Sequence, residues 1–115
     1  MKECIFIRRV SGVESMSEIE FLLKLEEIID ERARSRNESS YTWRLISAGL
    51  GKICKKVLEE SGEVVIAALS ESNDRLVEET ADLLYHLLVL LRYKGLSIRD
   101  VVKLLEKRHL ERTGK

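Results

Sequence analysis

The 115-residue sequence contains no proline, and its six glycines fall mostly where a helical pattern would end. Proline breaks helix interiors because it lacks an N–H and clashes with the preceding turn, so its absence permits long helices. Apolar residues recurring at helical spacing predict four helices. These cover about residues 17–34, 41–68, 74–93 and 97–112. Because short polar connections favour antiparallel neighbours, the predicted fold class is all-α, with a four-helix antiparallel bundle-like arrangement.

Local signals mark where these helices begin and end. Ser17 and Glu20 have the spacing of a capping box, and Ser97 with Asp100 marks the start of the last helix. Gly95 is placed to stop the helix that ends near residue 93. Three glycines within residues 41–68 weaken that helix, each by about 1 kcal/mol relative to alanine. They favour a bend or the close approach of another helix there.

The charge balance excludes several classes of partner. Lys plus Arg and Asp plus Glu both total 20, so the formal net charge is zero. A neutral chain offers no general electrostatic attraction for nucleic acid or for a membrane surface. No apolar run reaches the roughly 18 residues of a membrane span. Cys4 and Cys54 form no CxxC pair, which fits a reducing compartment, and the predicted location is cytoplasmic.

The chain length indicates one domain that associates with itself. A single chain this short buries limited apolar surface, so a homodimer that shares a helical face is expected. Residues 17–115 are predicted to form the domain. Residues 1–16 are assigned to a short N-terminal extension, because Met16 precedes what reads as a fresh beginning.

Charged residues gather on one face of the predicted helix over residues 41–68. At 100° per residue, five of them fall within about one third of its circumference. A solvated face with ordinary i,i+4 charge pairs explains this helix if it is taken alone. The five residues are Lys52, Lys56, Glu59, Glu60 and Glu63.

The next predicted helix favours a functional interpretation. Its sequence is nearly all apolar between Leu76 and Leu91, yet a narrow polar stripe runs through it. A buried carboxylate without a partner is costly, and neighbouring carboxylates repel one another. Two facing helices with such groups are best explained by a shared divalent cation, and an all-oxygen ligand set favours Mg²⁺ or Mn²⁺ over Zn²⁺. The stripe consists of Glu78, Glu79, Asp82 and His86.

The spacing within this stripe also argues against oxygen-activating di-iron chemistry. Di-iron bundles use Glu-x-x-His pairs, whereas this helix carries Glu79-x-x-Asp82. His86, four residues further on, is interpreted as a satisfied interior or supporting residue rather than a ligand.

An Mg²⁺ site of this kind indicates hydrolysis of a phosphoanhydride. The ion keeps coordination positions for water and for phosphate oxygens, and it offsets charge on a phosphate chain. Glu59 or Glu60 is the candidate general base that takes the proton of the attacking water. Lys52 and Lys56 would supply local positive charge for the phosphates.

The pattern Glu-Glu-x-x-Glu followed by Glu-x-x-Asp resembles the signature of the all-α nucleotide pyrophosphohydrolases, the MazG-like superfamily. Within that superfamily the sequence is most similar to the phosphoribosyl-ATP pyrophosphohydrolase family. The resemblance covers about residues 17–112. It is carried by Ser40-Tyr41-Thr42, Gly49, Lys52-Ile53, Lys55-Lys56, Glu59-Glu60, the run from Glu63 to Ala68 and the run from Glu79 to His86.

This resemblance implies hydrolysis of phosphoribosyl-ATP to phosphoribosyl-AMP and pyrophosphate with Mg²⁺, the second step of histidine biosynthesis. It also implies a dimer in which helices of both subunits pack together. Glu59 matches the first acidic residue of the motif, with a role in water activation. The residues that match the metal-binding carboxylates are Glu60, Glu63, Glu79 and Asp82. The candidates for phosphate or ribose contacts are Tyr41, Lys52 and Lys56.

Two other functions stay open at this point. A housecleaning enzyme of the same superfamily, acting on a nucleoside triphosphate, would use the same carboxylates. Ser40-Tyr41-Thr42 and Tyr85-His86 favour the histidine-pathway enzyme. A non-catalytic helical dimer would predict a helix over residues 74–93 without its acidic stripe.

Nothing in the sequence resembles the cyclohydrolase domain that is sometimes fused to enzymes of this family, so the stand-alone form is expected.

Overall fold

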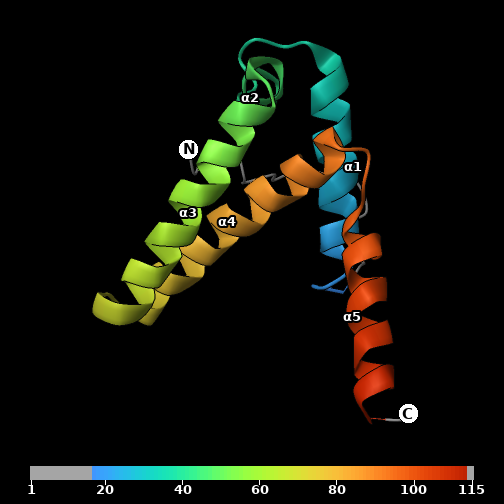
Figure 1. The fold of residues 1–115 in the computed structure, drawn as a ribbon. Coiled ribbons are helices and arrows are strands. Elements are labelled where there is room, and N and C mark those ends of the chain that lie inside the picture. Colours follow the sequence, from blue (N-terminus) through green and yellow to red (C-terminus); the bar gives the residue numbers. More distant parts are fainter. Residues whose placement is uncertain (1–16, 114–115) are drawn as a thin grey trace.

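The structure, a computed structural model, describes residues 17–113 and is entirely helical in its regular elements over that range. The predicted all-α class is therefore confirmed. The predicted N-terminal extension, residues 1–16, lies outside the described residues. The five helices are α1 (Phe21–Ser35), α2 (Tyr41–Ala48), α3 (Leu50–Ser70), α4 (Asn73–Tyr93) and α5 (Ile98–Thr113) (Figure 1).

The predicted count of four helices is wrong, because the helix expected over residues 41–68 is divided at Gly49. This glycine has φ +103°, a conformation that side chains with a Cβ rarely adopt, and it ends α2. Its N–H donates to the carbonyl of Ile46 at 3.1 Å. Gly51 and Gly62 lie inside α3 and do not interrupt it. Only one of the three glycines therefore changes the direction of the chain.

The predicted end signals are confirmed at both ends of the described chain. The Ser17 N–H donates to Glu20 Oε1 at 3.0 Å, and the Glu20 N–H donates to Ser17 Oγ at 3.1 Å, as in a capping box. Gly95, with φ +76°, follows the end of α4. The Ser97 N–H donates to Asp100 Oδ2 at 2.9 Å at the start of α5.

The hydrophobic core lies where α1, α2, the start of α3 and the second half of α4 meet. Burial of apolar side chains there supplies about 25 cal/mol per Å² removed from water. Tyr85 reaches from α4 to α2, where its hydroxyl makes a buried hydrogen bond with the hydroxyl of Thr42. The core residues are Leu25, Ile29, Leu45, Ile53, Tyr85, Leu88 and Val89.

Helices α3 and α4 form an antiparallel hairpin and the most extensive helix contact of the fold (Figure 1). Only Glu71 and Ser72 connect them, and Ser72 Oγ accepts the N–H of Arg75 at 3.2 Å to cap α4. The tight connection sets the register of the two helices. It thereby places the middle of α3 beside the first half of α4.

Helix α5 extends away from the hairpin (Figure 1). It is attached at its start, where Glu26 accepts hydrogen bonds from Ser97 Oγ at 2.9 Å and from the Ile98 N–H at 2.6 Å. Every described side chain of α5 from Arg99 to Arg112 is exposed. No helix in the described range has the length and apolar character needed to cross a membrane. The cytoplasmic location stays a prediction.

Large apolar side chains also remain exposed on the hairpin. Val77 is 67% exposed, so the expectation that the helix over residues 74–93 is buried on most sides holds only for its second half. A surface with this much apolar area is typical of a chain that associates through its helices. The exposed apolar side chains of the hairpin include Leu58, Val65, Ile66, Leu69 and Val77, and those of α5 include Val102 and Leu105.

Candidate metal centre

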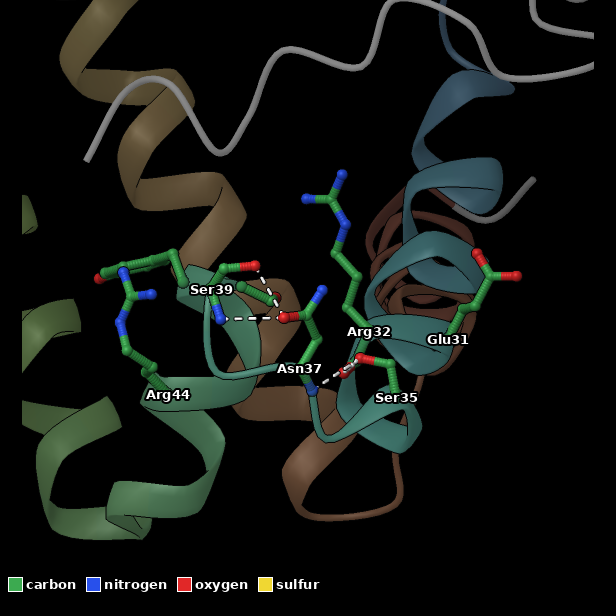
Figure 2. A pocket seen from close by; sticks show the side chains of 8 residues that line it. Glu31, Arg32, Ser35, Asn37, Ser39 and Arg44 are labelled. Atoms are coloured by element: carbon green, nitrogen blue, oxygen red, sulfur yellow. Dashed lines mark hydrogen bonds between the residues drawn. The ribbon is translucent and has the colours of Figure 1, made fainter.

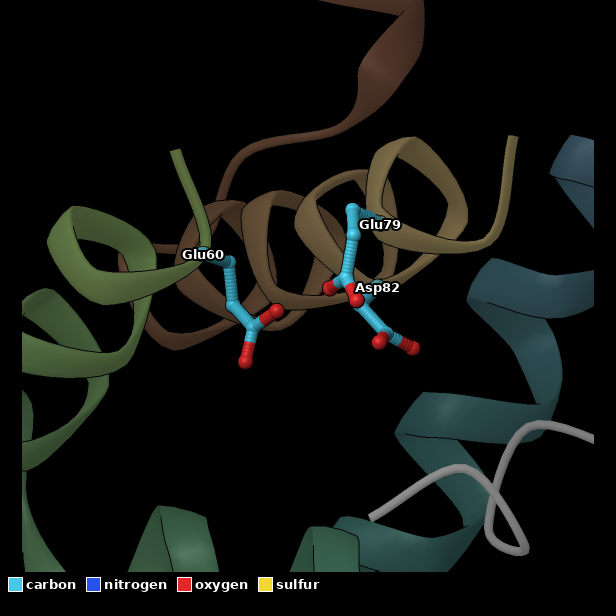
Figure 3. Close-up of side chains that lie close together, drawn as sticks. All are labelled: Glu60, Glu79 and Asp82. Carbon is cyan, nitrogen blue, oxygen red and sulfur yellow. The ribbon is translucent and has the colours of Figure 1, made fainter. Parts of the chain in front are cut away.

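Three carboxylates from the α3–α4 hairpin converge on one point (Figure 3). Glu79 and Asp82 lie three residues apart and share a face of α4, and Glu60 approaches from α3. One oxygen from each side chain lies within 4.8 Å of the other two. The three residues are only 4%, 2% and 3% exposed for Glu60, Glu79 and Asp82.

The charge of this cluster is partly balanced by two basic side chains. Lys56 Nζ lies 3.6 Å from Glu60 Oε2, and Arg75 Nη2 donates to Glu79 Oε2 at 2.6 Å. Among the described residues, no group hydrogen-bonds the buried Glu60 Oε1. An unsatisfied oxygen in a buried all-oxygen donor set fits a hard divalent cation. The residues present could therefore hold Mg²⁺ or Mn²⁺.

The other two predicted acidic residues lie outside this group of three. Glu63 is exposed but hydrogen-bonds the Glu79 side chain, and this contact is the main reason why the pKa of Glu63 is raised. Burial and the negative charges of Glu60 and Glu79 raise it further. The Glu59 side chain is 45% exposed and lies 3.7 Å from Lys56 Nζ. Glu63 thus adjoins the cluster, while Glu59 lies at its edge beside Lys56.

Arg75 is a site residue that the sequence interpretation missed. Its guanidinium donates to Glu78 Oε1 at 2.5 Å and to Glu79 Oε2 at 2.6 Å. The hydrogen bond with Glu78 is the first cause of the raised pKa of Arg75. The sequence carries a signal for these contacts, because Arg75 lies three residues before Glu78 and four before Glu79, and residues at these spacings are neighbours on a helix surface. Arg75 therefore connects the exposed Glu78 to the buried end of the cluster.

His86 is a fully buried interior histidine, as predicted, and it lies one turn beyond Asp82. Its Nδ1 lies 2.7 Å from the Asp82 carbonyl oxygen, which can only accept, so Nδ1 carries the proton. Nε2 then accepts from the Tyr41 hydroxyl at 2.7 Å. Burial lowers the pKa of His86, which favours this neutral form. The hydrogen bond between Tyr41 and His86 joins the start of α2 to α4 beside the carboxylates.

The three predicted substrate-binding residues are brought together at a small pocket of about 280 Å³. Tyr41 contributes from the start of α2, and Lys52 and Lys56 contribute from successive turns of α3. Arg44, which the sequence interpretation missed, is a third basic residue in the same wall. Since Lys56 also contacts Glu60, the pocket adjoins the carboxylate cluster. The remaining lining residues are Leu45 and Ala48.

An all-helical fold with a buried acidic cluster between two antiparallel helices, beside a lysine-lined pocket, has the features of an all-α nucleotide pyrophosphohydrolase. A family model gives the more particular assignment. Residues 22–109 match the model described as phosphoribosyl-ATP pyrophosphohydrolase. The chain belongs to this family.

Named relatives agree with this assignment. A phosphoribosyl-ATP pyrophosphatase of Pyrobaculum calidifontis is 56% identical over 87 residues, which cover 76% of this chain and 93% of the relative. The phosphoribosyl-ATP pyrophosphatase of Leptospira biflexa is 47% identical over 79% of this chain and 99% of its own length. A histidine biosynthesis bifunctional protein HisIE of Xylella fastidiosa is 47% identical over 78% of this chain and 44% of its own length.

Proposed function

We propose that this chain hydrolyses phosphoribosyl-ATP to phosphoribosyl-AMP and pyrophosphate in histidine biosynthesis. The observation that carries this proposal is the family match over residues 22–109, which includes both helices of the acidic cluster. Two relatives named phosphoribosyl-ATP pyrophosphatase match along more than nine tenths of their length. The buried carboxylates are the kind of site that this reaction requires.

The cation of this reaction is Mg²⁺, with Mn²⁺ as the substitute. Glu60, Glu79 and Asp82 would hold it, supported by their convergence within 4.8 Å. Glu63 would join them through its contact with Glu79. When bound, the ion would offset charge on the phosphate chain and lower the pKa of a water molecule.

The remaining polar residues have distinct roles in the proposal. Glu59, at the edge of the cluster, or Glu60, within it, accepts the proton of the attacking water. Lys52 and Lys56 bind phosphate oxygens, supported by their place in the wall of the small pocket. Tyr41 positions His86 through its hydroxyl and lines that pocket.

The functional unit is a homodimer. The exposed apolar side chains of α3, α4 and α5 support this proposal. Obligate helical assemblies typically bury such an apolar face at the interface between subunits. Analytical ultracentrifugation at micromolar concentration tests this point. A monomer under those conditions would contradict it.

The proposed activity is tested by pyrophosphate release from the purified protein with Mg²⁺. Phosphoribosyl-ATP is compared with a panel of nucleoside triphosphates at equal concentration, and chelator is added as the metal control. A strong preference for phosphoribosyl-ATP is the expected result. Preference for a nucleoside triphosphate would contradict the proposal and move the protein to nucleotide housecleaning.

A further inference from the structure

A second and larger pocket, of about 520 Å³, lies where α1 connects to α2 (Figure 2). Its size is typical of a site for a small molecule. Apart from Tyr41, none of its residues was among the predicted site residues. The pocket is lined by Arg32 and Ser35 at the end of α1, by Asn37 and Ser39 in the connection, and by Arg44 in α2, among others.

The lining of this pocket is rich in hydrogen-bond donors. Arg44 Nη1 donates to the Glu38 carbonyl at 2.9 Å, which uses one of the five N–H groups of the guanidinium. Asn37 Oδ1 accepts from the Ser39 N–H at 3.0 Å and from Ser39 Oγ at 2.7 Å. Its amide nitrogen, a donor, consequently points away from Ser39 (Figure 2). Two guanidinium groups and an amide donor in one pocket suit a phosphate group.

One carboxylate, Glu31, also lines this pocket. It lies on the far side of Arg32 from Arg44 in Figure 2. The space between Arg32 and Arg44 is therefore bordered by basic and neutral polar side chains. The local charge there favours an anion.

The two pockets adjoin each other. Tyr41 and Arg44 line both of them, and the smaller pocket continues to Lys52 and Lys56. Lys56 in turn lies 3.6 Å from Glu60 of the carboxylate cluster. A path lined by basic side chains thus leads from the cluster to the α1–α2 connection.

We propose that the α1–α2 pocket binds the 5′-phosphate on the second ribose of phosphoribosyl-ATP. This inference rests on the proposed function. The substrate carries a triphosphate at one end and a monophosphate at the other, with adenine between them. With the triphosphate at Lys52, Lys56 and the cluster, the monophosphate lies at Arg32 and Arg44. An ordinary nucleoside triphosphate has no group for this second pocket, so Arg32 and Arg44 set the choice of substrate.

The test uses the full chain with Mg²⁺ and two substrates. One is phosphoribosyl-ATP, and the other is the same molecule without the 5′-phosphate of its second ribose. The variant Arg32→Met removes a guanidinium that lines the α1–α2 pocket and not the smaller pocket of Lys52 and Lys56. It is expected to lower kcat/KM for phosphoribosyl-ATP by about 10- to 100-fold, the usual effect of removing hydrogen bonds to a charged group. For the dephosphorylated substrate, kcat/KM of this variant stays at the wild-type level. Arg32→Lys, which keeps the charge but not the planar fork, has an intermediate effect.

Arg34→Met is the matched control. Arg34 lies on α1 two residues from Arg32, pairs with Asp30 at 2.8 Å and does not line the pocket. Circular dichroism checks that each variant is folded. If Arg32→Met unfolds, Arg44→Met serves as the second test variant. Because Arg44 lines both pockets, its variant should lose more kcat/KM on phosphoribosyl-ATP than on the dephosphorylated substrate. An equal loss on both substrates, or the same loss in Arg34→Met, overturns the assignment of this pocket. A wild-type protein that does not hydrolyse phosphoribosyl-ATP overturns the proposed function, and the inference with it.

Discussion

Both halves of α4 contain fully buried side chains, but burial of those side chains has opposite energetic effects in the two halves. Glu79 and Asp82 in the first half are nearly inaccessible to water, as are Leu88 and Val89 in the second half. Burial of the apolar pair stabilises the fold, because it removes hydrocarbon from water. Burial of two carboxylates opposes folding, because it takes charge out of water and gathers like charges. The fraction of a side chain that is buried therefore does not show whether it stabilises the protein.

The two halves meet at His86, which belongs to both. Its ring is fully buried like the apolar residues after it, and its two nitrogens contact Asp82 and Tyr41. The comparison predicts that variants in the first half change catalysis, and variants in the second half change stability. Substitutions at the boundary change both by smaller amounts.

The largest expected effect is on activity, from Asp82→Asn in the first half. Loss of one charged oxygen ligand should lower the rate of pyrophosphate release by about 100-fold or more, because metal charge stabilisation is worth several kcal/mol. The temperature of unfolding should not fall, since one negative charge leaves the cluster. Enzyme assay and thermal unfolding are measured together.

Asp74→Asn on the first turn of α4 is the control for this variant, because Asp74 is exposed and outside the cluster. It should retain wild-type activity. If Asp82→Asn kept full Mg²⁺-dependent activity, or if it unfolded the protein, the contrast between the two halves would be wrong.

The next effect is on stability, from Leu88→Ala in the second half. Leu88 is 1% exposed, and truncation of a buried leucine lowers the free energy of unfolding by about 2–5 kcal/mol. Calorimetric titration with Mg²⁺ below the unfolding temperature should give wild-type affinity. The half-exposed Leu96, just after α4, is the comparison site, and Leu96→Ala should have a much smaller effect. A marked loss of Mg²⁺ affinity in folded Leu88→Ala would show that the two halves are coupled.

Tyr41→Phe tests the boundary between the halves. The variant leaves the buried Nε2 of His86 without the hydroxyl that donates to it, which should lower the free energy of unfolding by about 1–3 kcal/mol. Activity should fall less than in Asp82→Asn. Chemical denaturation measures the change, with Tyr93→Phe at the exposed end of α4 as the matched control. Equal stability of the two phenylalanine variants would argue against a structural role for this hydrogen bond.

The smallest effect is the pH dependence of stability that comes from His86. Burial lowers the pKa of His86 in the folded protein below its ordinary value of 6.5, so the unfolded chain takes up the proton first as pH falls. The contribution of His86 is fully present above about pH 6.5 and is lost as the pH falls toward the lower folded pKa, with a slope of at most about 1.4 kcal/mol per pH unit.

Chemical denaturation between about pH 7.5 and pH 5.5 checks this slope. The difference between the wild-type protein and His86→Gln isolates the histidine from the acidic groups. His109→Gln on the exposed surface of α5 is the control and should keep the wild-type slope. A wild-type slope in His86→Gln would contradict the assignment.

Much of the fold could be predicted because its signals are local. The capping box at Ser17 and Glu20 and the stop at Gly95 involve residues within one turn of each other. The break at Gly49 was harder, since Gly51 and Gly62 carry the same signal and remain helical. The difference lies in the backbone, because Gly49 has φ +103° and ends α2.

The candidate site was predictable in part. The spacing of Glu79 and Asp82 placed them on one helix face, and Glu60 was expected opposite them. Sequence could not separate Glu60, which is buried, from its exposed neighbours Glu59 and Glu63. That distinction depends on the rotation of α3 about its axis, which is set by packing against α4.

The sequence by itself determined the helical segments apart from the break at Gly49, the end signals at Ser17 and Gly95, the spacing of the acidic residues and the resemblance to a pyrophosphohydrolase family. These are properties of neighbouring residues, governed by a period of 3.6 and by local hydrogen bonds. Only the tertiary structure decided which carboxylates are buried together and that Arg32 and Arg44 share a pocket beside Lys56. Such groupings join residues of different helices, and only the packing of those helices brings the side chains to the same place.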